Sequence, residues 1–308
     1  MLTIEHLRKD YGNLTAVKDL SLHLEKGDVY GFIGPNGAGK TTTIKVCATL
    51  LEPTQGKVYV EGFDVTKKTN EVRGMIGYMP DFFGVYDDIM VWEYLDFFAA
   101  AYKIPRERRQ TIIDDVLELT DLTGKRDIYV EALSRGMKQR LCLAKTLLHD
   151  PKVLLLDEPA SGLDPRARVE IKELLKELKT MGKTILVSSH ILPELADFCN
   201  KIGIIEQGEL IVSGDVGEIM RKVQGGKGLQ ITLLADVEKA VALLSQLPKV
   251  KSVEQDNLCV CVQFSTDEVE NSEVLQLLIK NGLQVQSFSE TQVDLEDIFM
   301  KVTRGVVS

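Results

Sequence analysis

The segment GPNGAGKTT at positions 34–42 constrains the fold of this chain more than any other feature. It fits the pattern G-x-x-x-x-G-K-[ST], and it follows a strand-like apolar run at 29–33 and precedes a helical pattern at 40–50. Its glycines let the backbone curl so that N–H groups face phosphate oxygens, and the positive end of the following helix strengthens that attraction. The sequence therefore predicts a phosphate-binding loop between a strand and a helix.

Two side chains of this loop carry its predicted chemistry. Lys40 places a positive charge at the β- and γ-phosphates of a nucleotide, and the hydroxyl of Thr41 is positioned to bind Mg²⁺. Nucleotide contacts are predicted for the whole segment, which consists of Gly34, Pro35, Asn36, Gly37, Ala38, Gly39, Lys40, Thr41 and Thr42.

A second motif, KVLLLDEP at 152–159, places two adjacent carboxylates at the end of an apolar strand-like run. Ligands bind at the carboxyl ends of strands in parallel sheets, so Asp157 is predicted to hold Mg²⁺, through water, and Glu158 to accept a proton from an attacking water. An acidic pair of this kind is by itself more often a solvated turn. The prediction therefore depends on the phosphate-binding loop in the same chain.

The pattern of residues 1–223 predicts an α/β domain, because short apolar runs alternate with helical stretches. Its sheet is expected to be largely parallel, with strands at 29–33, 57–60, 153–156, 184–187 and 202–205. Strand patterns stop at about 82–149, where three helical patterns follow one another. This stretch is predicted to be a helical insertion.

The C-terminal part of the chain has a different rhythm and is predicted to be a second, smaller α+β domain. A glycine-rich break at 224–228 is expected to be the linker, and residues 229–308 the domain itself. Its predicted order β-α-β-β-α-β is that of the ferredoxin-like split motif. A last amphipathic helix, which Asp294 can cap, is expected to close this domain.

Composition excludes several functional classes. The 37 Lys and Arg against 46 Asp and Glu give a net charge of −9, which opposes a nucleic-acid partner. No apolar run approaches the roughly 20 residues of a membrane span, and no secretory signal is visible, so a cytoplasmic protein is expected. The five scattered cysteines suggest reduced thiols rather than a metal site. Guanine specificity is not expected, because the Asn200-Lys201 pair is followed by Ile and Gly instead of the N-K-x-D pattern.

Together with these motifs, LSRGMKQR at 133–140 makes residues 2–222 resemble the nucleotide-binding subunits of ABC transporters. The resemblance implies a P-loop NTPase (ABC ATPase) fold that works as a dimer. In that family the matching signature segment begins a helix and faces the ATP of the other subunit. Ser134 can cap this helix, and the backbone of Gly136 can approach the γ-phosphate closely.

The same resemblance implies roles for four further residues. Tyr11 matches the aromatic residue that stacks on adenine, and Val17 lies where the family packs a small apolar side chain near the nucleotide. Asp164 matches the loop that passes between the two subunits. His190 matches the histidine that senses the γ-phosphate and orients water.

The sequence departs from the family pattern at three positions. Asp81 stands where the family usually has glutamine, although the exporter branch often has an acid there; it can bind Mg²⁺ or accept from water but cannot donate as an amide does. Arg135 and Met137 replace a glycine and a glutamine of the commonest signature form. The sequence leaves open whether Arg135 contacts phosphate or solvent.

The function implied by the resemblance is an ATPase that drives transport through a separate permease on the inner face of the cell membrane. Two copies, or one copy and a close relative, would enclose two ATP·Mg²⁺. The tail VDLEDIFMKVT at 293–303 is similar to that of exporter ATPases that handle drugs, lipids, polysaccharides or peptides. The aromatics Phe82, Phe83 and Tyr86 would either dock a permease helix or belong to the core of the helical insertion.

Two alternatives are weighed against this function. A soluble ABC-type ATPase of translation or DNA repair would typically carry two cassettes, a long charged insertion or a basic surface, none of which this chain shows. A regulatory module that has lost hydrolysis is disfavoured because Lys40, Asp157, Glu158 and His190 are all present.

Overall fold

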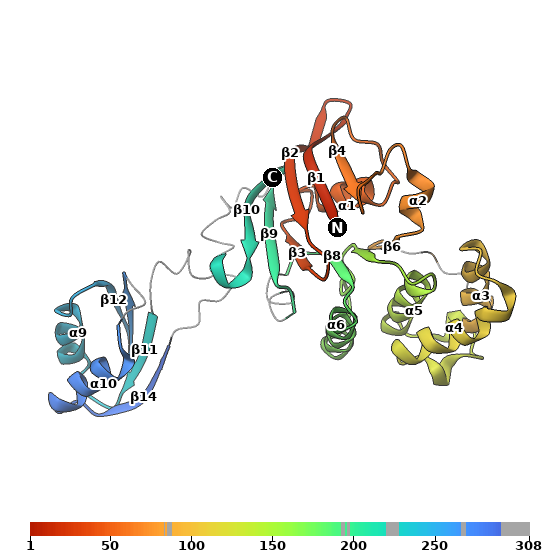
Figure 1. Cartoon of the computed structure of the whole chain (residues 1–308). Coiled ribbons are helices and arrows are strands. Elements are labelled where there is room, and N and C mark those ends of the chain that lie inside the picture. The colour runs from red at the N-terminus through yellow and green to blue at the C-terminus, as the bar shows by residue number, and fades with distance from the viewer. Residues whose placement is uncertain are drawn as a thin grey trace. The chain divides into compact units, whose positions relative to one another are not determined.

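The computed structural model describes residues 1–82, 84, 88–191, 195, 198–219, 228–265 and 269–290. The chain divides into two compact units, Met1–Val216 and Gly217–Ser308 (Figure 1). Most of the linker expected at 224–228 and all of the tail from residue 291 onward lie outside the described residues. The boundary expected near residue 223 therefore stays a prediction.

The first unit is built on strands that alternate with helices. The strands are β1 (Leu2–Tyr11), β2 (Leu14–Leu24), β3 (Val29–Ile33), β4 (Gln55–Val60), β5 (Phe63–Asp64), β6 (Ile76–Met79), β7 (Val153–Leu156), β8 (Thr184–Ser189), β9 (Lys201–Glu206) and β10 (Glu209–Asp215). They form one sheet in the order β5-β4-β1-β2-β10-β9-β3-β8-β7-β6. The five strands expected from the sequence are all present.

The sheet has a parallel half and an antiparallel half. Strands β9, β3, β8, β7 and β6 pair in parallel, as expected of an α/β domain. Strands β2, β1, β4 and β5 pair antiparallel, so the strand expected at 57–60 belongs to a part of the sheet that is not parallel. The two halves meet where β2 pairs with β10 through the single residue pair Asp19 and Glu209.

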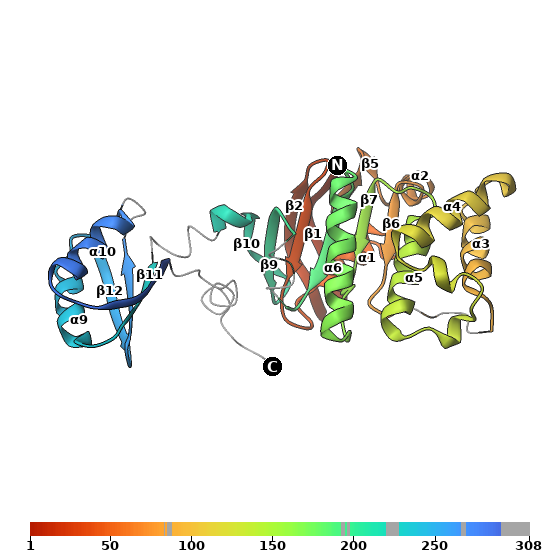
Figure 2. The same cartoon turned by 90° about the horizontal axis from the view of Figure 1, so that it is seen from below.

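The helices of the first unit lie on both faces of the parallel half and beside its edge. They are α1 (Lys40–Cys47), α2 (Thr69–Arg73), α3 (Val91–Ala101), α4 (Arg106–Leu119), α5 (Arg135–Leu147) and α6 (Pro165–Thr180). Figures 1 and 2 show α1 and α6 on opposite faces of the sheet, and α3, α4 and α5 gathered beside its β6 edge. The predicted helical insertion at 82–149 is therefore present.

The central strands are buried on both sides, which fixes the ends from which the functional loops leave. All residues of β3, β7 and β8 are buried. On the α1 face, Phe32, Leu155 and Leu186 pack with Ile44 of α1 in one apolar cluster. Burying large apolar side chains of this kind stabilises a fold by roughly 1.5–3 kcal/mol each, so the strand ends are held on a rigid base.

The second unit has the predicted ferredoxin-like order. Its elements are β11 (Gly228–Leu233), α9 (Val237–Ser245), β12 (Val250–Asp256), β13 (Cys259–Phe264), α10 (Asn271–Lys280) and β14 (Val285–Glu290). The sheet is antiparallel with the order β12-β13-β11-β14. Its core joins Leu244 of α9 and Leu278 of α10 to Ile231 and Phe264 of the strands.

Helices long and apolar enough to span a bilayer are not found in the part of the chain that the structure describes.

Candidate functional site

The loop between β3 and α1 has the shape that its glycines predict. Gly39 has a φ of 109°, in the left-handed region that disfavours side chains. A Cβ at Gly39 would lie 2.7 Å from the carbonyl oxygen of Ala16, and a Cβ at Gly34 only 2.2 Å from that of Ile205. Both positions therefore require glycine, because neighbouring backbone leaves no room for a side chain.

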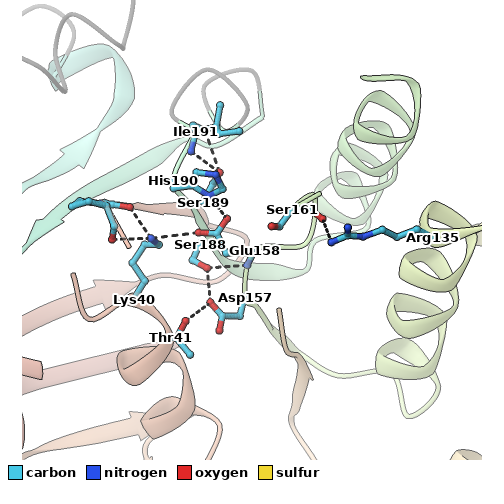
Figure 3. A network of polar contacts seen from close by, with 12 residues as sticks. Lys40, Thr41, Arg135, Asp157, Glu158, Ser161, Ser188, Ser189, His190 and Ile191 are labelled. Carbon is cyan, nitrogen blue, oxygen red and sulfur yellow. Dashed lines mark hydrogen bonds and ion pairs between the residues drawn. The ribbon is translucent and has the colours of Figure 1, made fainter. Parts of the chain in front are cut away.

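The ammonium group of Lys40 lies over this loop. Its Nζ donates to the carbonyl oxygens of Gly34 at 2.6 Å and Pro35 at 3.2 Å. It also lies 3.4 Å from Oε1 of Glu158, a residue that follows the end of β7 (Figure 3). Lys40 is 5% exposed, so this charge is held in a position where loop and acidic strand end meet.

Asp157 links the loop to two neighbouring strands. Its Oδ1 accepts from the Thr41 hydroxyl at 3.1 Å and from the Ser188 hydroxyl at 2.8 Å. Its Oδ2 is buried and has no hydrogen-bond partner among the described residues. Burial raises the pKa of Asp157, although the bonds from Ser188 and Thr41 partly oppose it. A bound cation would reverse this effect, and the free carboxylate oxygen beside a hydroxyl is the donor set that Mg²⁺ prefers.

Glu158 contacts Ser188 and His190 in addition to Lys40. Its backbone N–H donates to the Ser188 hydroxyl at 3.0 Å, and Nδ1 of His190 lies 2.8 Å from its Oε2 (Figure 3). The backbone of Glu158 has a φ of 50°, which is uncommon for a residue with a long side chain. Strain of this type persists where the surrounding structure determines the conformation, as at functional sites.

The signature residues lie at the start of α5, and Asp164 at the start of α6. Ser134 caps α5, where its hydroxyl accepts from the N–H of Met137 at 3.3 Å. Asp164 caps α6 by accepting from the N–H of Ala167 at 3.0 Å. Within the described ranges, no hydrogen bond or ion pair joins Ser134 or Gly136 to the network around Lys40 and Glu158. The structure therefore gathers the loop and the acidic motif around Lys40, whereas, among the described residues, Ser134 and Gly136 take no part in that network.

The remaining predicted residues lie on β1, on β2 and after β6. Tyr11 ends β1, is 44% exposed, and has Nζ of Lys9 5.3 Å from its ring centroid. Val17 is buried, and its Cγ2 would lie 3.2 Å from a Cβ at Gly39. Asp81 is exposed after β6, close enough to Asp157 to raise the pKa of that carboxyl further.

Ser188 is a site residue that the sequence motifs did not predict, and its hydroxyl connects Asp157 with the backbone of Glu158. The motif SSH that ends in His190 was a signal that could have found it. The aromatic loop is described only in part. Phe82 is 89% exposed, whereas Phe83 and Tyr86 lie outside the described residues.

Comparison with known proteins identifies the family. Residues 17–161 match the family described as ABC transporter, and residues 214–303 match the C-terminal domain of DrrA1-3-like ATP-binding proteins. The bacitracin transport ATP-binding protein BcrA of Bacillus licheniformis is 35% identical over 302 residues, covering 97% of this chain and 96% of its own length. The chain belongs to the ABC transporter family of ATP-binding proteins. This confirms the resemblance predicted from the sequence.

Other members of the ABC family match most of this chain. The linearmycin resistance ATP-binding protein LnrL of Bacillus subtilis is 31% identical over 305 residues and is covered over 98% of both chains. A solved ATP-binding subunit of an ABC transporter matches with a TM-score of 0.66 at 28% identity, over 72% of this chain and 93% of that one. A dimeric ABC cassette in a post-hydrolysis state with ADP and phosphate matches with a TM-score of 0.63 at 25% identity, over 70% and 99%. The P-loop NTPase fold and the ATPase class are thereby confirmed.

Proposed function

We propose that this ABC ATPase works as a dimer that binds ATP·Mg²⁺ and drives export through a separate membrane permease. The observation that carries the proposal is the network in which Lys40, Thr41, Asp157, Glu158 and His190 meet at the carboxyl ends of β3, β7 and β8. In open α/β sheets this edge is where ligands bind.

The loop supplies the binding of the triphosphate. Backbone N–H groups of the glycine-rich loop and of the start of α1 would bind the phosphates, and Lys40 would exchange its loop carbonyls for the β- and γ-oxygens. The adenine stacks on the exposed ring of Tyr11, and the buried Val17 supports the loop from behind.

Three oxygen-bearing side chains would hold the metal ion: Thr41, Asp157 and Asp81. The buried Oδ2 of Asp157, which has no partner among the described residues, supports this assignment. When bound there, Mg²⁺ would neutralise phosphate charge. A site with one or two protein carboxylates is typical of Mg²⁺ bound together with phosphates.

Glu158 acts as the general base for hydrolysis. It takes a proton from a water whose oxygen attacks the γ-phosphorus, and the bond to the β-phosphate oxygen breaks to give ADP and phosphate. His190, at 2.8 Å from Glu158, orients this carboxylate and senses the γ-phosphate. The second subunit completes the site. Its Ser134 and Gly136 contact the γ-phosphate, and its Asp164 lies at the interface between the two subunits.

Transport is supported by the relatives, which match almost the full length of this chain. One is named for bacitracin transport and another for linearmycin resistance, and the C-terminal match belongs to DrrA1-3-like ATP-binding proteins. We therefore assign the chain to the inner face of the cell membrane, bound to a permease. These relatives favour transport over a role in translation or DNA repair.

The proposal is tested by mild purification of the full chain from membranes, with identification of the proteins that accompany it. A hydrophobic polypeptide in fixed ratio, together with Mg²⁺-dependent ATP hydrolysis, is the expected result. Ribosomes or DNA in place of such a polypeptide would contradict the transport function while leaving ATP hydrolysis intact.

A further inference from the structure

The first residue of α5, Arg135, contacts the segment that follows Glu158. Its Nη2 donates to the carbonyl oxygen of Ser161 at 3.3 Å, and the guanidinium lies against Gly162 (Figure 3). A Cβ at Gly162 would lie 2.2 Å from Nη2, and Gly162 has a φ of 66°. The structure thus answers what the sequence left open: Arg135 binds backbone of its own subunit.

A second side chain makes a parallel contact one helical turn later. Gln139 is buried, and its Nε2 donates to the carbonyl oxygen of Pro159 at 2.7 Å. Residues four apart lie on the same face of a helix, so Arg135 and Gln139 hold two carbonyls of one loop. Beside them, a Cβ at Gly136 would lie 3.0 Å from the Cβ of Ala167 in the first turn of α6.

We propose that Arg135 and Gln139 form a clamp that makes the start of α5 and the loop 158–164 move as one body. Arg135 is then a positioning residue that couples the two ATP sites of the dimer. Glu158 begins the loop and belongs to the subunit's own site, whereas Ser134 and Gly136 face the ATP of the partner. This inference rests on the dimeric function proposed above.

The two contacts connect α5 to the backbone that follows Glu158. The carbonyls of Pro159 and Ser161 lie one and three residues after Glu158, so a change of backbone at Glu158 displaces both acceptors. Buried Gln139 serves as the anchor, since a buried amide or carbonyl left without a hydrogen-bond partner destabilises the fold. Arg135 is exposed, so its guanidinium can bind or release the Ser161 carbonyl without loss of the fold. This suits Arg135 for coupling rather than for stabilising the fold.

The competing explanation is that Arg135 binds the phosphate of the partner's ATP directly. A double-mutant cycle separates the two, because only the clamp requires Arg135 and Gly162 to act together. The proteins are the full-length wild type, Arg135→Ala, Gly162→Ala and the double variant. Arg166→Ala is the matched control, because Arg166 is a neighbouring arginine whose side chain is 90% exposed and paired with Glu170 of its own helix.

Two quantities are measured for each protein: the ATP dependence of hydrolysis, with its Hill coefficient, and the affinity of the dilute subunit for a fluorescent ATP analogue. We expect Arg135→Ala to lower the Hill coefficient toward one and to raise the half-saturating ATP concentration about tenfold. The affinity of the dilute subunit should change less than twofold. Gly162→Ala should reproduce these changes. In the double variant, the half-saturating ATP concentration should differ less than twofold from that of Arg135→Ala. Arg166→Ala should match the wild type in both quantities.

Three outcomes overturn the clamp. Unchanged cooperativity in Arg135→Ala would show that Arg135 does not couple the two sites. If the effects of Arg135→Ala and Gly162→Ala on the half-saturating ATP concentration are fully additive in the double variant, Arg135 acts on the partner's phosphate instead. A wild type with neither cooperativity nor ATP-dependent dimers refutes the proposed dimeric function itself, and the clamp with it. Thermal melting checks folding, and Arg135→Lys, which keeps one donor for Ser161, should restore part of the cooperativity.

Discussion

Nδ1 of His190 lies 2.8 Å from Oε2 of Glu158, where the adjacent parallel strands β7 and β8 end. The other carboxylate oxygen of Glu158 lies 3.4 Å from Nζ of Lys40. One oxygen of Glu158 thus contacts His190 after β8, and the other lies at ion-pair distance from Lys40 at the start of α1. The direction of the carboxylate is therefore set before any water is positioned. Preorganisation of this kind lowers the cost of aligning a base with its target.

Glu158→Gln should reduce ATP hydrolysis at least about 100-fold, because an amide keeps the shape of the side chain but cannot take a proton. ATP binding should persist, and the ATP-bound dimer should live longer. Phosphate release and size-exclusion chromatography measure the two effects. Turnover within tenfold of the wild type would remove Glu158 from the role of base.

His190→Ala should lower the maximal rate of hydrolysis by about 10- to 100-fold while the affinity for ATP changes little, because Glu158 loses the group that orients it. His6→Ala is the control, since the His6 side chain is 80% exposed and pairs with Asp19 away from this network. Equal rates in the two variants would contradict the orienting role.

Gly34→Ala should weaken ATP binding at least about tenfold and lower the melting temperature, because its Cβ would lie 2.2 Å from the carbonyl oxygen of Ile205. Gly124→Ala, where a Cβ meets nothing within 4 Å, should leave both unchanged. Nucleotide titration and thermal melting of the two variants give the comparison. Normal ATP binding by Gly34→Ala would show that the loop can shift to accommodate a side chain and still bind ATP.

Asp28 predicts a pH-dependent contribution to stability. Burial by itself raises the pKa of Asp28, but hydrogen bonds from Lys201 at 2.7 Å, Asn200 at 2.9 Å and the N–H of Glu25 outweigh it, so the folded-state pKa lies below 3.8. A carboxyl with a lowered folded-state pKa stabilises the fold above its unfolded pKa, and this contribution disappears as the pH falls through the folded value.

Asp28→Asn should therefore cost about 1–3 kcal/mol of unfolding free energy at pH 7, and less as the pH falls below about 3.8. Denaturant unfolding of wild type and variant across this range measures the difference. Asp19→Asn serves as the control, because the Asp19 side chain is 65% exposed. If the difference in unfolding free energy between wild type and Asp28→Asn grows toward acid pH, the predicted direction of the pH dependence is wrong.

A fragment that ends at Val223 should fold and bind ATP with an affinity close to that of the full chain. The apolar clusters of the two units share no residue, so the cut removes none of the first core. Circular dichroism and nucleotide titration test the fragment. A folded fragment without ATP binding would contradict the predicted boundary.

The sequence predicted the loop, α1 and β7 well because their signals are local. The run 153–156 is buried on both faces, so it is apolar at every position, and the glycines of 34–39 follow from backbone sterics. Strands β1 and β2 were missed because their exposure alternates and register shifts interrupt their pairing. The hydrogen bonds of Ser188 and the acceptor of Arg135 could not be predicted, because each contact depends on how elements 26 to 31 residues apart pack together.

The single residue pair between β2 and β10 has a mechanical consequence for nucleotide binding. Tyr11 belongs to the antiparallel half of the sheet and Lys40 to the parallel half, and only Asp19 with Glu209 continues the strand ladder across the seam in the described chain. In the proposed complex, a nucleotide whose adenine stacks on Tyr11 and whose phosphates bind Lys40 would bridge the two halves of the sheet. Leu20 of β2 and Phe32 of β3 belong to one apolar core that already joins these halves. The bound nucleotide would add a further connection between them.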